Sequence, residues 1–160
     1  MLNVGLMIDV KLPFPPSVNK AYATTRSGRR LLTSEGKLFK QSIRDIIGQK
    51  YAVLTPELAR VGEVPLSLTI TLYTQTENKG WSQGKAKNRY KRVDVSNRVK
   101  LLEDAVFESL DVDDSLVFSL HVYKVSSDDE YVHLTLKEES LDQRDREESA
   151  SQGNDRSKST

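Results

Sequence analysis

Hydrophobic and polar residues alternate along one stretch of the chain, as they do in a β-strand with a single buried face. In residues 66–72, four aliphatic side chains alternate with serine and threonine, which predicts a half-buried strand. Three further segments are apolar and rich in residues that favour strands: 4–12, 116–125 and 131–137. We expect a strand in each of them.

Apolar residues recur instead at every third or fourth position in two other segments, which predicts two helices. The first covers residues 34–50, where Thr33-Ser34 can cap the first turn and one phenylalanine and three isoleucines form the apolar stripe. The second begins near Asp94 and runs to about Leu110. Its apolar side holds Val99, Leu102, Val106 and Leu110, and its polar side holds Asn97, Lys100, Asp104 and Glu108.

These elements follow one another in the order β-α-β-loop-α-β-β, which indicates the α+β class. We expect a small mixed sheet with both helices on one face. The last two strands are predicted to form an antiparallel hairpin through residues 126–129, and the first half can form a βαβ crossover. Three prolines between residues 12 and 19 predict an extended loop, which a basic loop follows at residues 20–33.

Length and composition indicate one domain of 160 residues. We assign residues 1–138 to this domain and 139–160 to a disordered tail, because only Leu141 and Ala150 are apolar in the tail. The chain has no cysteine and two histidines, which excludes disulfides, thiolate metal sites and a histidine-rich zinc site. It shows neither a signal peptide nor an apolar run of membrane-spanning length, so we expect a soluble cytoplasmic protein without membrane contact.

A net charge of +1 conceals a strong division along the chain. Residues 20–100 hold 17 Lys or Arg against 6 Asp or Glu, whereas residues 101–160 hold 6 against 16. Residues 79–92 carry six basic side chains and no acidic one, together with Trp81 and Tyr90. This pattern favours contact with nucleic acid. The residues that we expect to bind DNA are Lys20, Arg29, Arg30, Lys85, Lys87, Arg89, Lys91 and Arg92.

The basic segment leads directly into a polar stretch, Asp94-Val95-Ser96-Asn97-Arg98-Val99-Lys100. Asp113-Asp114 follows the second helix and adds two carboxylates. A bound divalent cation would explain why acidic side chains lie next to a surface suited to a polyanion. The alternative is an ordinary amphipathic helix, with Asp94 capping its start and Lys100 paired with Asp104 at the i+4 spacing.

Three blocks in this order resemble the RusA family of Holliday-junction resolvases, endonucleases that cut four-way DNA junctions and are frequently carried by prophages. The first block is Leu12-Pro13-Phe14-Pro15-Pro16-Ser17-Val18-Asn19, followed by Gly28-Arg29 and Ser34-Glu35-Gly36-Lys37. The second is the stretch that begins at Asp94, together with Asp104-Ala105, and the third is Asp113-Asp114. The resemblance covers about residues 6–137.

The resemblance implies a homodimer that resolves a four-way DNA junction by paired phosphodiester hydrolysis, with Mg²⁺ as cofactor and Mn²⁺ able to substitute. It implies that Asp94, Asp113 and Asp114 bind the metal, and that Lys100 and Asn97 complete the catalytic set. Lys100 would stabilise charge on the phosphate in the transition state. Asn97 would orient Asp94 or contact the phosphate.

The chain departs from the family signature at Ser96, where members often have a second aspartate. A serine hydroxyl is neutral and a poorer ligand for a hard cation. One alternative is therefore a branched-DNA-binding protein of the same fold that cuts weakly or not at all. Another is a single-strand or RNA-binding module in which Trp81, Tyr90 and Tyr22 stack on bases. A protein-interaction domain would leave the division of charge unexplained.

Overall fold

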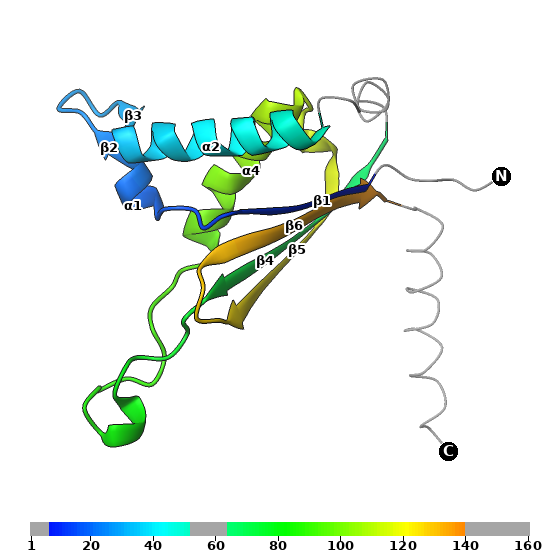
Figure 1. Ribbon diagram of the computed structural model, residues 1–160. Helices are drawn as coiled ribbons and strands as arrows, with labels where there is room; N and C mark the ends of the chain where they lie inside the picture. Colours follow the sequence, from blue (N-terminus) through cyan, green and yellow to red (C-terminus); the bar gives the residue numbers. More distant parts are fainter. Residues whose placement is uncertain (1–6, 52–63, 140–160) are drawn as a thin grey trace, which may run out of the picture.

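The computed structural model of the protein describes residues 7–51 and 64–139 (Figure 1). Within these residues, the α+β class and the order of the main elements agree with the sequence prediction. The start of the expected first strand and the expected tail from residue 140 onward lie outside the described residues. The domain boundary after residue 138 therefore stays a prediction.

Four strands form one mixed sheet in the order β1-β6-β4-β5. Their bounds are Met7–Pro13 for β1, Leu66–Thr74 for β4, Val117–Ser126 for β5 and Tyr131–Glu138 for β6. β6 is antiparallel to both β1 and β4, and β5 is parallel to β4. β4 and β6 therefore lie inside the sheet, and β1 and β5 are its two edges.

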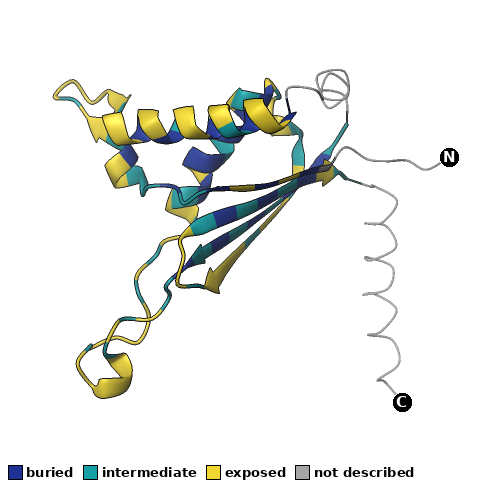
Figure 2. Cartoon of the chain, viewed as in Figure 1, coloured by how far each residue is buried: buried dark blue, intermediate teal, exposed yellow. Residues whose placement is uncertain are grey.

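Both long helices, α2 (Ser34–Tyr51) and α4 (Ser96–Leu110), lie on the same face of this sheet (Figure 1). Their buried residues face the sheet and their exposed residues face solvent (Figure 2). The four residues predicted for the apolar side of α4 are all buried, as the helical period requires. At the start of α2, Thr33 Oγ1 accepts a hydrogen bond of 3.2 Å from the N–H of Gly36, which confirms the predicted cap. No helix in the described part of the chain is long and apolar enough to cross a membrane.

β5 and β6 do not form the predicted hairpin, because β4 lies between them. The crossover β4-α4-β5 makes β5 a parallel neighbour of β4. β6 then lies on the other side of β4, where it pairs antiparallel with two strands at once. Thr74 holds the connecting loop across the end of β4: its carbonyl oxygen accepts the Ser127 N–H at 3.0 Å, and its hydroxyl donates to Glu130 at 2.6 Å.

The predicted βαβ crossover in the first half of the chain is present as β1-α2-β4, but it is split by another strand. β1 and β4 run in the same direction with α2 between them, but β6 separates them in the sheet. The crossover between adjacent parallel strands is β4-α4-β5. A strand late in the sequence thus enters the middle of the sheet, which local patterns could not indicate.

The region between β1 and α2 has more regular structure than the sequence predicts. Residues 14–17 have neither helix nor strand, as predicted for the proline block. The rest of the region forms a short helix α1 (Val18–Ala21) and a hairpin of β2 (Tyr22–Thr24) and β3 (Arg30–Leu32) in place of a basic loop. Gly28 lies in the turn with a φ of 80°, a conformation that favours glycine. Gly36 lets α2 approach this unit, because a Cβ there would lie 2.6 Å from a carbonyl oxygen of α1.

The packing of α4 predicts how strongly one side chain contributes to stability. Leu102 is 0% exposed, and Leu102→Ala should lower the free energy of unfolding by about 2–5 kcal/mol because it leaves a cavity. Urea denaturation measures this change. Leu38 on α2 is 70% exposed, so Leu38→Ala is the matched control and should change the free energy by less than about 0.5 kcal/mol. Equal effects would contradict the placement of α4.

Candidate active site

Residues 75–93, called the basic arm from here on, form a narrow projection between β4 and α4 (Figure 1). Its two sides are joined by backbone hydrogen bonds of 2.8 Å from Asn78 to Arg89 and from Lys91 to Thr76. The segment predicted as a loop is therefore an extended ribbon with a defined direction.

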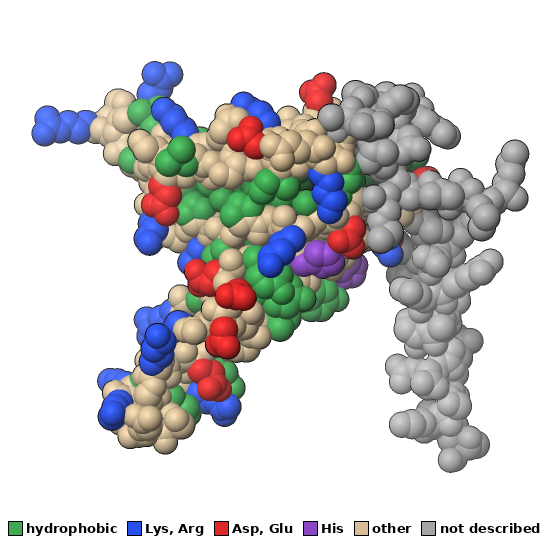
Figure 3. Space-filling model, viewed as in Figure 1, with side chains coloured by type: hydrophobic (Ala, Val, Ile, Leu, Met, Phe, Trp, Pro, Cys, Tyr) green, Lys and Arg blue, Asp and Glu red, His purple; other side chains and the backbone are tan. Residues whose placement is uncertain are grey.

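The basic arm carries five of the eight residues predicted to bind DNA, and its Lys and Arg side chains are spread over the projection (Figure 3). Trp81 and Tyr90 are exposed on it as well. Arg89 forms an ion pair of 2.8 Å with Glu77, which raises the pKa of Arg89 and offsets part of its charge. The arm therefore presents both positive charge and aromatic surface to solvent.

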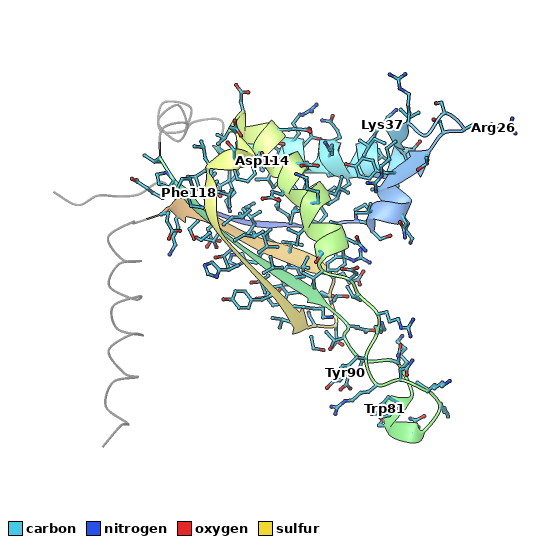
Figure 4. All side chains as sticks on the ribbon, turned by 180° about the vertical axis from the view of Figure 1, so that it is seen from behind. Arg26, Lys37, Trp81, Tyr90, Asp114 and Phe118 are labelled. Atoms are coloured by element: carbon cyan, nitrogen blue, oxygen red, sulfur yellow. The ribbon has the colours of Figure 1, made fainter. Side chains whose placement is uncertain are left out.

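The other three predicted DNA-binding residues, Lys20, Arg29 and Arg30, are exposed on α1 and the β2-β3 hairpin. Arg30 lies over the ring of Tyr22, 4.9 Å from its centre. In both Figures 1 and 4 the hairpin and the basic arm extend from the same end of the molecule. Two basic groups that are distant in sequence thus project from one end of the fold.

Arg98, to which the sequence assigned no role, connects the N-terminal proline block to the start of α4. Its guanidinium donates a hydrogen bond to the carbonyl oxygen of Pro15 and lies 4.9 Å from the ring centre of Phe14. A surface depression forms there, and Lys20 and Glu130 contribute to its lining. Spacing could not reveal this contact, because 83 positions separate its two partners.

Asp94 lies two residues before α4 and is bound by the first turn of that helix. Its carboxylate accepts a hydrogen bond of 2.6 Å from the side-chain amide of Asn97 and a longer one, 3.4 Å, from the backbone N–H of Asn97. The carboxylate is thereby held at the positive end of the helix dipole. Both residues are exposed, so Asp94 is accessible from solvent.

Asp113 and Asp114 lie in the turn between α4 and β5. The carboxylate of Asp113 accepts a hydrogen bond of 2.8 Å from the backbone N–H of Ser115 and caps a short 3₁₀ turn. Hydrogen bonding by the side chain and then the backbone of Ser115 lowers the pKa of Asp113. Asp114 faces α4, and its carboxylate lies 3.4 Å from Nζ of Lys100.

Lys100 lies between two carboxylates, since its Nζ is 2.8 Å from Asp104 and 3.4 Å from Asp114. Hydrogen bonding, to Asp104 first and then to Asp114, raises the pKa of Lys100, and the ammonium remains charged at neutral pH. Nearby, burial raises the pKa of Glu103. The i+4 pair with Asp104 is present, and the same lysine also reaches the acidic turn.

Asp94 and the pair Asp113-Asp114 are attached at opposite ends of α4. The helix has 15 residues and such a helix spans about 22 Å. Figure 4 shows Asp114 well apart from Trp81 and Tyr90 on the basic arm. Among residues 7–51 and 64–139, no three Asp, Glu, His or Cys side chains are grouped so that they could hold a metal ion. Within the described residues, one subunit therefore offers no group of three such ligands around a single point.

Residues 13–137 match a protein-family model described as endodeoxyribonuclease RusA. The chain belongs to the RusA family. RusA-family proteins are endodeoxyribonucleases that resolve Holliday junctions, so the chain is a nuclease of this kind and a DNA junction is its class of substrate. A comparison with curated proteins found no match.

The RusA match includes the basic arm, the β2-β3 hairpin and both ends of α4. RusA-family nucleases are generally dependent on a divalent metal. In this chain Ser96 is the exposed first residue of α4, so the helix start offers Asp94 as its one carboxylate. The acidic residues suited to a metal are thus divided between the two ends of the helix.

The contacts of Asp113 predict how it titrates. The pKa of Asp113 in the folded protein lies below the ordinary aspartate value of about 3.9. The charged carboxylate therefore stabilises the fold fully at any pH above the ordinary value. This stabilisation is lost as the pH falls through the folded pKa. Side-chain ¹³C NMR should give a midpoint below the ordinary value. Ser115→Ala removes the side-chain contact, keeps the backbone N–H and should raise the midpoint. A native midpoint at or above the ordinary value would contradict this capping geometry.

Proposed function

We propose that this RusA-family protein is a Mg²⁺-dependent homodimer that cuts two opposing strands of a four-way DNA junction by hydrolysis. The observation that carries the proposal is the position of Asp94 at the base of the basic arm, on a helix whose other end carries Asp113 and Asp114. Carboxylates next to a surface for a polyanion are expected where a cation lies between them and the DNA.

Asp94, Asp113 and Asp114 are the proposed ligands, because Mg²⁺ takes oxygen donors and keeps several waters. Mn²⁺ accepts the same donors and can substitute. Since one helix separates Asp94 from the acidic pair, we propose that each metal site combines Asp94 of one subunit with Asp113 and Asp114 of the other. A two-fold dimer then has two equivalent sites, one for each strand that is cut.

Lys100 and Asn97 are the proposed supporting residues. Lys100 remains charged next to Asp114, where an ammonium can stabilise the negative charge that develops on a phosphate. Asn97 holds the carboxylate of Asp94 through a hydrogen bond of 2.6 Å and so restricts its orientation. These roles are supported by the contacts of the two side chains and by their place on α4.

The basic arm and the β2-β3 hairpin are proposed to hold the arms of the junction. Both extend from the same end of the molecule. Together with Lys20 on α1, they carry the eight Lys and Arg side chains named above. Their positive charge suits phosphates, and Trp81 and Tyr90 can stack on bases that a junction leaves accessible.

Removing a proposed ligand should stop cleavage without preventing binding. We expect Asp94→Asn and Asp114→Asn each to lower the rate of cutting a synthetic four-way junction in Mg²⁺ by about 100-fold or more, because charge stabilisation at the phosphate is lost. Gel assays of paired nicks and of junction binding measure both effects. Asp45→Asn on the exposed side of α2 is the matched control. A wild-type protein that binds junctions but cuts in neither Mg²⁺ nor Mn²⁺ would replace the proposal with the inactive-binder alternative.

Mixing the two variants tests whether each site is shared between subunits. In a heterodimer of Asp94→Asn and Asp114→Asn, one shared site carries both substitutions and the other carries neither. The mixture should therefore recover cutting of one strand, whereas each variant alone stays inactive. If each site were built within one subunit, every site in the heterodimer would carry one of the two substitutions and the mixture would be inactive. An inactive mixture would therefore contradict the shared arrangement.

The basic arm predicts a specific salt dependence of junction binding. Each phosphate contact contributes about 0.9 to the slope of log K against log salt concentration. Replacing both Lys85 and Lys87 with glutamine should reduce the slope by roughly 1–2, as measured by fluorescence anisotropy. Lys137→Gln on β6 is the control, since Lys137 is exposed at the end of the sheet away from the arm. An unchanged slope in the double variant would place the arm away from the DNA.

A further inference from the structure

The depression beside Arg98 combines apolar walls with charged groups of both signs. Its volume is about 340 Å³, which is in the range of sites that hold small molecules. The apolar walls come from the proline block and from Phe39 on α2. Four charged side chains also contribute to the lining, two of each sign: Lys20, Arg98, Glu35 and Glu130. The lining as a whole is therefore close to neutral.

This depression lies where the two basic projections begin. Lys20 is on α1, which leads directly into β2 of the hairpin. Arg98 is in the first turn of α4, which follows the basic arm along the chain. Asp94 and Asn97 belong to the same helix start. A DNA strand that contacts both projections (Figure 1) and Asp94 therefore has the depression within reach of its bases.

Arg98 offers hydrogen-bond donors that the fold does not use. Its guanidinium lies 4.9 Å from the ring centre of Phe14 and donates to the carbonyl oxygen of Pro15. Within residues 7–51 and 64–139 this is its one hydrogen bond, whereas an arginine side chain has five N–H donors. The residue is half-buried, so these contacts hold the guanidinium in place and leave most of its donors for a ligand.

The two carboxylates supply acceptors on the same lining. Glu35 is exposed in the first turn of α2. Glu130 accepts a hydrogen bond of 2.6 Å from the hydroxyl of Thr74, which leaves lone pairs on its two oxygens for further donors. Carboxylates accept hydrogen bonds from the amino groups of bases. The depression therefore has donors and acceptors together with apolar walls.

We infer that the depression binds one unstacked nucleobase of the DNA junction and thereby sets the phosphate next to that base at Asp94. A base is planar and uncharged, and its edge carries both donors and acceptors, so it matches a neutral lining of this kind. Unpaired or mismatched bases leave a helix at the lowest cost, which favours bases at the branch point. The inference deepens the proposed function and rests on it for the role of Asp94.

A phosphate of the DNA backbone fits the same lining less well. Glu35 and Glu130 offset the charges of Lys20 and Arg98, and each carboxylate repels a phosphate. The basic arm carries its Lys and Arg side chains on an exposed projection instead (Figure 3), where they suit the backbone. The projections and the depression therefore match different parts of one DNA strand.

Fluorescence of a base analogue tests whether a base leaves the stack. Stacking quenches 2-aminopurine, so its emission should rise at one position next to the branch point when the protein binds the junction without divalent metal. Arg98→Lys and Glu35→Ala should each reduce this rise. Arg44→Lys and Asp45→Ala, on the exposed side of α2, are the matched controls and should keep it. Emission that stays unchanged at every position next to the branch point would overturn the inference.

An abasic residue at the responsive position tests whether these side chains contact the base. The measured quantity is the ratio of the Kd for the abasic junction to the Kd for the intact junction, again without divalent metal. This ratio should be larger for the wild type than for Arg98→Lys or Glu35→Ala by roughly 5-fold or more, because a base contact present only in the wild type is lost. The two control variants should give the wild-type ratio.

Circular dichroism and thermal melting establish that each variant is folded. If Arg98→Lys does not fold, Glu35→Ala decides the result alone, since Glu35 is exposed. Equal ratios of Kd for the wild type and the folded variants would overturn the inference.

Failure of the base site is distinguishable from failure of the proposed nuclease, because neither binding measurement depends on cleavage. A junction whose base enters the depression but is not cut in Mg²⁺ or Mn²⁺ upholds the site and refutes the nuclease mechanism. An enzyme that cuts, but whose ratio of Kd is the same in the folded variants, upholds the nuclease and refutes the site. In Mg²⁺ the nick should fall at a phosphate next to the responsive base, and a nick elsewhere would contradict the positioning of that phosphate.

Discussion

The burial of one side of α4 against the sheet is the interaction on which the rest of the molecule depends. Val99, Leu102, Val106 and Leu110 are buried in the core, and the helical period then places the polar residues of α4 outside it. Because α4 is the crossover between two parallel neighbours, it runs against the direction of β4 and β5. The two ends of α4 therefore lie at opposite ends of β4 and β5. Asp94 lies at one of these ends, and Asp113 and Asp114 lie at the other.

This arrangement explains why the proposed metal ligands of one subunit do not lie together. A nuclease with a metal cofactor needs several oxygen ligands around one ion. Here the proposed acidic ligands lie before and after one helix. Asp94 is engaged with Asn97, and Asp114 with Lys100. Neither carboxylate is buried, so both are accessible from solvent. The sharing of sites between subunits proposed above would reconcile the family chemistry with the geometry of one chain.

Basic and apolar side chains occupy different parts of the surface. The β2-β3 hairpin and the basic arm extend the positive surface beyond the sheet at one end, where long projections can follow the branches of a DNA substrate. The apolar surface is gathered instead on the β5 edge, while the β1 edge is closed by Tyr51 and Lys50. The basic surface and the apolar surface therefore lie on different parts of the fold.

Sequence patterns predicted the long helices and the buried strands well, because the periods of Leu66 to Leu72 and of the α4 stripe are local properties of the chain. The candidate site residues that the motifs indicate stay a prediction, and the structure places them at the two ends of α4. The patterns failed at the hairpin of β5 and β6 and at the contact of Arg98 with Pro15, for the same reason in each case. A period shows which face of a segment is buried but not which segment lies beside it.

The amino-acid sequence by itself therefore determined the two long helices, the four strands of the main sheet, the basic segments and the family to which the chain belongs. Tertiary structure alone decided that β6 inserts between β1 and β4, that the two basic projections share one end, and that the acidic residues are separated by α4. These features depend on pairings between residues that are distant along the chain. Such pairings depend on which apolar surfaces of the whole chain can be buried against one another. The sequence of a single segment does not show its partner.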